Sequence, residues 1–221
     1  DTIMSEREIT VWAEEDIVSA VGESGSSYLE TGMAPANIVS GSFSITSRNG
    51  AIGLDDQPIV VAQWGDFPLV AHARDDIWIK DIVGAVEIGD VTSTTGMIDL
   101  TAARGWLTYH RTADKILSAE SIGLHAGLGW MGIALTPDSD AAPTDGDQLQ
   151  VALDGGGIAG SAPDFIRINS PGDLPLLGAE SETRVNVSAA GDIINATGDD
   201  TAVNATAPVV ELSSESGRIG G

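Results

Sequence analysis

The chain has 221 residues, of which 33 are acidic and 10 basic, and its formal net charge is −23. A charge of this sign opposes binding to phosphate backbones and to anionic membrane surfaces, so nucleic acid is disfavoured as a partner. The sequence contains no cysteine and no apolar run near the roughly 20 residues of a membrane span, which predicts a fold held by packing, without disulfides and without membrane insertion.

A repeated pattern begins close to the N-terminus. It reads apolar, any, apolar, any, Ala, any, any, Asp, Ile, and it occurs at residues 9–17, 69–77 and 185–193. Its alternation places one side chain inward and the next outward, so each copy predicts a strand with one buried face. The three aspartates of the pattern are expected to cap the turn that follows the strand. They are Asp16, Asp76 and Asp192.

A second pattern follows the first at both ends of the chain. Residues 43–53 match residues 210–220, and the shared order of the two patterns indicates duplication. Asn49 and Gly50 together resemble a hairpin signal. However, the matching Gly217 follows a serine, so both glycines predict a corner between successive strands of a coil.

Related units lie between the two ends, at residues 98–107 and 122–131. Each is a short alternating run followed by a glycine and further apolar residues, whereas helical periodicity is nearly absent. Coils of roughly 20 to 30 residues, each too small to bury its apolar face alone, would stack into one continuous core. The small residues Ala13, Ala73, Ala102 and Ala189 suit a narrow coil interior.

These features predict an all-β parallel β-helix that forms a single unit over residues 1–221. We expect roughly eight to ten rungs in a rod about 40 to 50 Å long. Irregular loops are expected around residues 22–37 and 136–173, where the alternation fails and where, in the second segment, aspartate and proline are frequent.

The repeats resemble those of the filamentous haemagglutinin-like family, the exoproteins of two-partner secretion and related giant repeat-rich bacterial surface proteins. The resemblance rests on the segment 50–60, with its Gly-Ala-Ile-Gly, short loop and Pro58, on the Ala-x-x-Asp-Ile units, on residues 86–91 and on the closing segment 217–220. It implies a right-handed parallel β-helix, export to the cell surface or outside, and a structural or adhesive function without catalytic residues. It also implies an internal segment of a longer coil, whose polypeptide continues past Gly221.

Adjacent acidic residues are the features most suggestive of catalysis. They occur as Asp55-Asp56, Asp75-Asp76 and Asp199-Asp200. Polysaccharide-cleaving enzymes use paired carboxylates, but neighbours in a strand point to opposite faces and cannot form such a pair. We therefore expect no enzyme, and keep a polysaccharide-acting β-helix enzyme as the alternative.

Metal and nucleophile signals are weak. The acidic run at residues 138–147 has oxygen donors for calcium but lacks the spacing of a calcium-binding loop. We expect no cofactor, and keep a calcium-stabilised surface-layer component as a second alternative. The histidines, His72, His110 and His125, have no ligand spacing. A Ser-His-Asp triad stays open, without a nucleophile motif to support it.

Two tryptophans are the candidate contact surface. Trp106 and Trp130 follow the turn glycines of units that lie 24 residues apart, a plausible single rung, so they are expected to lie above one another on one face. They either pack under a loop or contact a glycan or a protein. The expected partners are neighbouring repeats of the same polypeptide or other surface proteins, with glycans as a further candidate.

Overall fold

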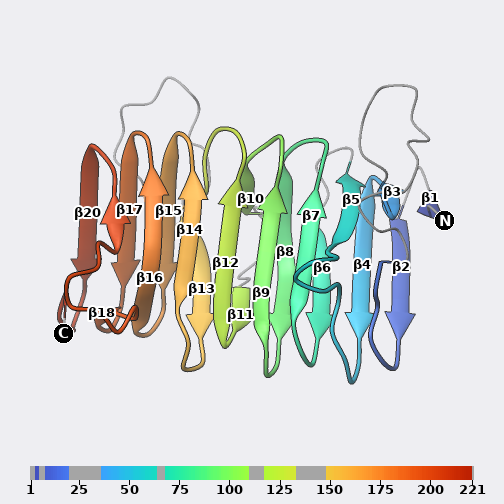
Figure 1. Ribbon diagram of the computed structural model, residues 1–221, viewed down its shortest axis with the longest axis horizontal. Helices are drawn as coiled ribbons and strands as arrows, with labels where there is room; N and C mark the ends of the chain where they lie inside the picture. The colour runs from blue at the N-terminus through green and yellow to red at the C-terminus, as the bar shows by residue number, and fades with distance from the viewer. Residues whose placement is uncertain are drawn as a thin grey trace.

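The computed structural model describes residues 3–4, 8–19, 36–63, 68–109, 117–132 and 148–220. These residues form strands, turns and bends and contain no helix, so none of them forms a helix able to cross a membrane. The strands belong to two parallel sheets, and the chain alternates between them along most of its length (Figure 1). The predicted all-β parallel β-helix is therefore confirmed.

Sheet A is the sheet nearer the viewer in Figure 1. Its main path consists of β1 (Ile3–Met4), β3 (Ile38–Ser40), β5 (Ile59–Gln63), β7 (Ile77–Asp81), β9 (Met97–Ala102), β12 (Ser121–Ala126), β14 (Ile158–Ala162), β16 (Leu174–Ser181) and β18 (Ile193–Asn195), and β19 (Ala205–Thr206) also pairs with β16. Every pair in this sheet is parallel.

Sheet B lies behind sheet A in Figure 1. Its main path consists of β2 (Glu8–Ala13), β4 (Ser42–Ser47), β6 (Leu69–Ala73), β8 (Val86–Ser93), β11 (Leu117–Ala119), β13 (Leu149–Leu153), β15 (Phe165–Ser170), β17 (Arg184–Ala189) and β20 (Val209–Ser214), and β10 (Leu107–Tyr109) pairs with β8. The nine strands of each path lie within the predicted number of rungs, and at about 4.8 Å spacing they extend roughly 40 Å.

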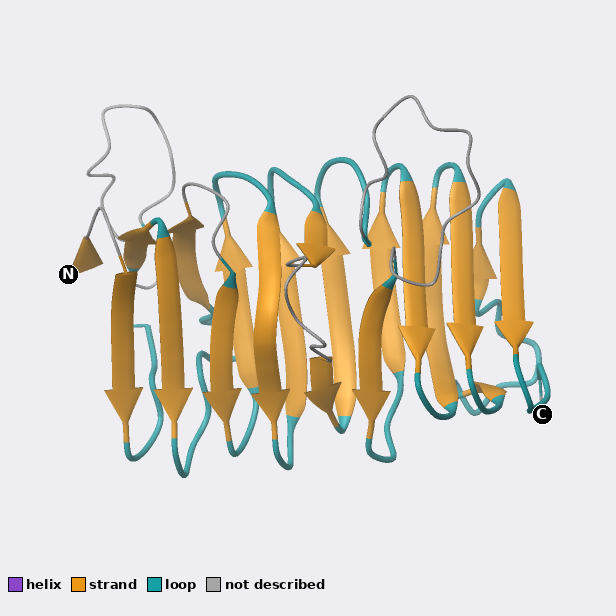
Figure 2. Ribbon diagram, turned by 180° about the vertical axis from the view of Figure 1, so that it is seen from behind, coloured by secondary structure: helices purple, strands orange, loops and turns teal. Residues whose placement is uncertain are grey.

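The coil is right-handed. In Figure 1 the chain advances from right to left, and the near strands run upward while the far strands run downward. Figure 2 shows the same sense from behind, with the strands of sheet B now nearest the viewer and pointing down. The handedness that the family resemblance implied is the one observed.

The sequence repeats occupy equivalent positions on successive rungs. Ile9 pairs with Phe43 and Val185 with Val210, so at each end the second pattern stacks directly on the first. The related units at 98–107 and 122–131 stack in the same way in sheet A, where Ile98 pairs with Ile122. A repeat in the sequence is therefore a repeat in space.

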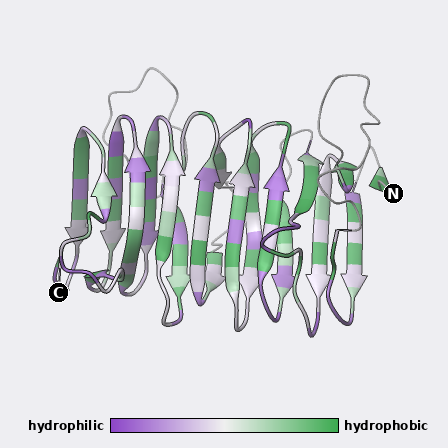
Figure 3. Cartoon of the chain, viewed as in Figure 1, coloured by the Kyte–Doolittle hydropathy of each residue, from purple (hydrophilic) through white to green (hydrophobic). Residues whose placement is uncertain are grey.

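The core lies between the two sheets. Strands such as β6 and β17 alternate buried and partly exposed residues along their length, and the bands of hydropathy in Figure 3 follow this alternation. Ala73, Ala102 and Ala189 are buried as expected, whereas Ala13 is only half-buried because β2 lies at the edge of sheet B.

The prediction of an irregular loop over residues 136–173 is wrong for the second part of that segment. Residues 149–170 contain the three strands β13, β14 and β15, and each continues its sheet. The alternation was hard to recognise because β14 consists mainly of Ala, Gly and Ser, and because the glycine-rich turn at 154–157 interrupts the pattern. Residues 136–147, and residues 22–35 of the other expected loop, lie outside the described residues.

The corners after the strands of sheet B are closed by a clamp between rungs. Asp16 Oδ1 accepts a hydrogen bond from Ala51 N at 2.8 Å, and Asp76 Oδ1 accepts one from Met97 N at 2.8 Å. Asp192 Oδ1 accepts one from Arg218 N at 2.6 Å. The turn-capping role predicted for these aspartates is confirmed, with the addition that each caps the turn of the next rung.

A serine and a glycine complete each clamp. Ser47 Oγ donates to Glu15 O of the preceding rung and accepts from Gly50 N, and Ser93 and Ser214 make the equivalent pairs of bonds. A Cβ at Gly50 would overlap the carboxylate of Asp16. The glycine is therefore required because the aspartate of the preceding rung occupies the space that a side chain would need.

We expect Asp76→Ala to lower the free energy of unfolding by about 1 kcal/mol, since the Met97 N–H loses its acceptor. Urea unfolding measures the change. The matched control is Asp56→Ala, which removes the same charge from an exposed turn position and should leave stability within about 0.5 kcal/mol. Equal losses in both variants would contradict the clamp.

Candidate functional site

An aromatic ladder runs along one edge of the coil. The Trp106 and Trp130 rings are stacked with centroids 4.7 Å apart and planes 15° apart, and Phe165 continues the stack 5.8 Å from Trp130 at 10°. The expectation that the two tryptophans lie above one another is confirmed. We name Trp106, Trp130 and Phe165 the aromatic ladder.

Backbone pairing places these three rings. Leu107 pairs with Met131, and Met131 pairs with Ile166, so the residue before each of them falls on the same line across three rungs. Sequence reasoning missed Phe165 because it lay in the segment expected to be irregular. The sequence signal that identifies Phe165 is an aromatic residue directly followed by a buried apolar residue, as in the two tryptophan units.

The two ends of the ladder differ. The Arg167 guanidinium lies 4.5 Å from the centroid of Phe165, a cation–π contact that covers one end. At the other end Leu107 pairs with Val86, so Ala85 is the residue of the neighbouring rung that corresponds to Trp106. Since alanine has no ring to continue the stack, the ladder stops at Trp106, a residue that is 38% exposed.

A second group of polar residues crosses the outer face of sheet A. His125 Nδ1 lies 2.9 Å from Ser161 Oγ, and His125 Nε2 lies 3.7 Å from Asp99 Oδ2. The three residues come from β12, β14 and β9 on consecutive rungs. The sequence did not predict this cluster. His125 is 26 residues from Asp99 and 36 residues from Ser161, and only the register of the strands shows that the three residues are neighbours.

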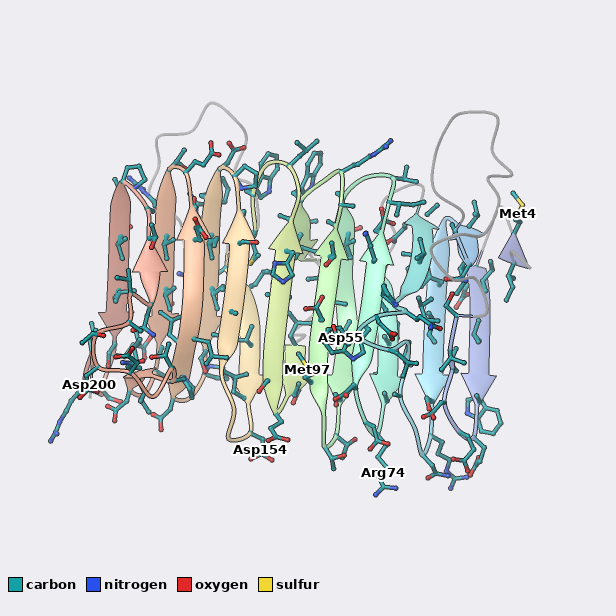
Figure 4. The ribbon with its side chains drawn as sticks, in the orientation of Figure 1. Met4, Asp55, Arg74, Met97, Asp154 and Asp200 are labelled. Atoms are coloured by element: carbon teal, nitrogen blue, oxygen red, sulfur yellow. The ribbon has the colours of Figure 1, made fainter. Side chains whose placement is uncertain are left out.

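The carboxylate of Asp99 in this cluster has a raised pKa. Burial raises the pKa of Asp99, and the nearby charge of Asp55 raises it further, while His125 and a hydrogen bond from Thr101 oppose the shift. Figure 4 shows Asp55 in the loop that lies over sheet A beside β9. Asp99 leans over Gly123, where an added Cβ would lie 2.7 Å from Asp99 Oδ2.

The cluster has the residue types of a catalytic triad but not its surroundings. Ser161 lies within β14, which pairs on one side with β12 and on the other with β16. In an interior strand the N–H groups belong to the ladders on both sides, so those beside Ser161 are engaged and not available to stabilise an oxyanion. The arrangement is best described as a polar row on a flat sheet.

In two of the adjacent acidic pairs, a carboxylate is engaged in hydrogen bonds of a turn. Asp76 caps the next turn, whereas Asp75 Oδ1 accepts a hydrogen bond from Thr95 Oγ1 at 3.2 Å. Asp199 accepts from Thr201 N and Oγ1, and these hydrogen bonds lower its pKa. Figure 4 shows Asp200 in the C-terminal loop, far along the coil from Asp55.

The other candidates from the sequence are placed as follows. His72 Nε2 lies 3.9 Å from Asp90 Oδ2 on sheet B, away from His125, and His110 lies outside the described residues. The acidic run 138–147 also lies outside them. Within the part of the chain that the structure describes, no group of three or more His, Asp or Glu side chains is arranged to hold a metal ion.

Comparison with protein-family models, with curated proteins and with solved structures finds no match to this chain.

Proposed function

We propose that the chain is a structural or adhesive segment of a large secreted or cell-surface repeat protein, and that the aromatic ladder is its contact surface. The observation that carries the proposal is the exposed Trp106 at the open end of a stack of three rings. Tryptophans are enriched at binding hot spots, where they supply a large apolar area on a rigid side chain.

The architecture supports a rod that displays a surface. Hydrogen bonds between rungs hold the backbone of the two tryptophans, since Val86 N donates to Trp106 O and Leu107 N donates to Trp130 O, and Phe165 lies in β15. Little conformational entropy is therefore lost when a partner packs against the rings. The net charge of −23 keeps such rods apart in dilute salt, and it favours a neutral or basic partner. The partners that fit are neighbouring repeats, other surface proteins and glycans.

A binding experiment tests the ladder. The chain is titrated with neutral and acidic polysaccharides and with a basic surface protein, and tryptophan emission is followed. We expect emission to change with at least one of them, and Trp106→Ala to weaken binding by about tenfold or more, the loss of a hot-spot residue. Trp12→Ala is the control, because Trp12 is 62% exposed and lies outside the ladder. Equal binding by all three proteins would contradict the proposal.

A polysaccharide-acting enzyme is the second candidate, and one observation favours it: Asp55 and Asp99 approach each other from separate rungs, and the pKa of Asp99 is raised. A carboxyl group with a raised pKa beside a second carboxylate is the arrangement of the acid and base of a glycosidase. We expect no depolymerisation of neutral or acidic polysaccharides. Product formation that Asp99→Asn abolishes would reverse the order of the two proposals.

The calcium-stabilised alternative has a simple readout. A ligand that binds only the folded state raises the melting temperature as its concentration rises. A large increase in the melting temperature with calcium, absent with magnesium, would favour a surface-layer component. We expect the two ions to act alike, through screening of the acidic surface.

A further inference from the structure

The aromatic ladder is capped at one end by a side chain of the protein itself. The Phe165 ring lies against Trp130, and the guanidinium of Arg167 lies 4.5 Å from the centroid of the Phe165 ring. A guanidinium is planar and weakly hydrated, so it stacks on an aromatic face and is also attracted by the charge distribution of the ring. The structure therefore contains its own example of a group that completes this stack.

The opposite end of the ladder, at Trp106, faces a rung that has no ring. The stack with Trp130 covers one face of the Trp106 indole, and the second face is directed along the coil toward the rung of Ala85. The side chain at that neighbouring position is a single methyl group, and Trp106 is 38% exposed. We name this second face of Trp106 the open indole face.

Contacts between rungs hold the open indole face in place. Val86 N donates a hydrogen bond to Trp106 O at 2.9 Å. A Cβ at Gly105 would overlap the carbonyl group of Gly84, so the two rungs are in direct contact. A Cβ at Gly129 would lie 3.7 Å from Trp106 Cβ and Cε3, so the turn of the following rung packs against the indole. A partner group therefore meets a face that the fold has already ordered, and the ordering cost of binding is small.

Charge favours a cation at the open indole face. The chain has 33 acidic and 10 basic residues, so its surface attracts cations. One basic residue, Arg104, is exposed and lies two positions before Trp106. Among the described residues the cation–π contact is the one between Arg167 and Phe165, so Arg104 is not stacked on Trp106. A neutral sugar can stack on the same face but gains nothing from the charge of the chain.

We propose that the open indole face of Trp106 binds the guanidinium of an arginine on a basic partner protein. The bound guanidinium continues the stack at Trp106 in the way that Arg167 completes it at Phe165. This inference rests on the proposed function, because it uses the same contact surface, and it names the chemistry by which the partner is recognised. A glycan is the competing occupant.

Matched peptides test this assignment. The probes are a lysine-rich peptide with one central arginine, the same peptide with lysine at that position, and the same peptide with citrulline there. Calorimetry at about 0.15 M salt measures each affinity. Arginine and lysine carry the same charge, so a difference between them reports stacking. We expect the arginine peptide to bind about fivefold more tightly than the lysine peptide, and the citrulline peptide, which has the planar shape without the charge, to bind more weakly than the arginine peptide.

Variants of the chain assign this preference to the open indole face. Trp106→Ala should remove the preference for arginine over lysine, whereas Trp106→Tyr, which keeps a ring, should retain part of it. Ala85→Arg places a guanidinium of the chain beside the face and should also remove the preference, whereas Ala85→Ser should retain it. Trp12→Ala is the control outside the ladder and should retain it fully. Circular dichroism and urea unfolding verify that each variant is folded.

The outcomes separate the nature of the occupant from the contact surface itself. Equal binding of the arginine and lysine peptides would overturn the inference, and so would a preference that folded Trp106→Ala or folded Ala85→Arg retains. If the inference fails in this way but polysaccharide binding depends on Trp106, the contact surface stands and a glycan is its occupant. If no ligand depends on Trp106, the proposed function fails as well.

Discussion

Asp81→Ala is expected to lower the free energy of unfolding by about 3 kcal/mol or more. Asp81 is fully buried, and its carboxylate accepts hydrogen bonds from Gln63 N at 2.9 Å, Val83 N at 2.8 Å and Gly84 N at 3.0 Å. Each buried donor that loses its acceptor costs about 1 to 3 kcal/mol. Urea unfolding monitored by circular dichroism measures the loss.

Asp81→Asn is the matched variant for the charge. Burial raises the pKa of Asp81, although the three N–H donors oppose this shift. The folded state therefore binds the proton more readily than the unfolded state, and the contribution of Asp81 to stability falls as pH rises from the usual value of 3.8 through the raised one. The asparagine variant lacks this titration.

The pH dependence follows from that sign. The free energy of unfolding of the natural chain, minus that of Asp81→Asn, should be largest in acid and should decrease as pH rises toward neutrality. Unfolding curves of both proteins at matched pH values measure the difference. A difference that increases with pH would mean that the carboxylate is stabilised as an anion, contrary to the effect of burial.

Gly105→Val should cost about 3 kcal/mol, the upper range for overpacking. A Cβ at Gly105 would overlap the carbonyl group of Gly84 on the neighbouring rung, and backbone in paired rungs cannot move aside without breaking the ladder. The control lies directly opposite. Gly84→Ala meets no heavy atom within 4 Å, so its stability should stay within about 0.5 kcal/mol of the natural chain. Equal effects in both variants would contradict the close approach of these rungs.

The sequence predicted the fold where its alternation was clear. The units 98–107 and 122–131 are 24 residues apart, and the structure pairs Ile98 with Ile122 and Leu100 with Leu124. The strand β14 was missed because its small residues carry little of the β-branched and aromatic signal that identifies a strand. Its strand conformation comes from pairing with neighbours on both sides rather than from its own composition.

The candidate site was predictable only in part. The stacking of Trp106 and Trp130 followed from two turn glycines at equivalent positions, which is local information. The meeting of Asp99, His125 and Ser161 depends on the register of three rungs, and no short motif contains it. The structural role of Asp81 could not be predicted from the sequence either, because its carboxylate accepts a hydrogen bond from Gln63 N on another rung.

The stacked, in-register coil predicts the pairing of β4 with β6, and cross-linking within one chain measures this pairing directly. In Ser44→Cys/Val70→Cys the two thiols belong to directly paired residues on the outer face, whereas Ser44→Cys/His72→Cys displaces one of them by two residues. We predict that a short thiol-reactive reagent closes the first pair within one chain, seen by mass spectrometry of the linked peptide, and leaves the second largely open. Preferential closure of the second pair, or equal closure of both, would contradict the stacked, in-register coil.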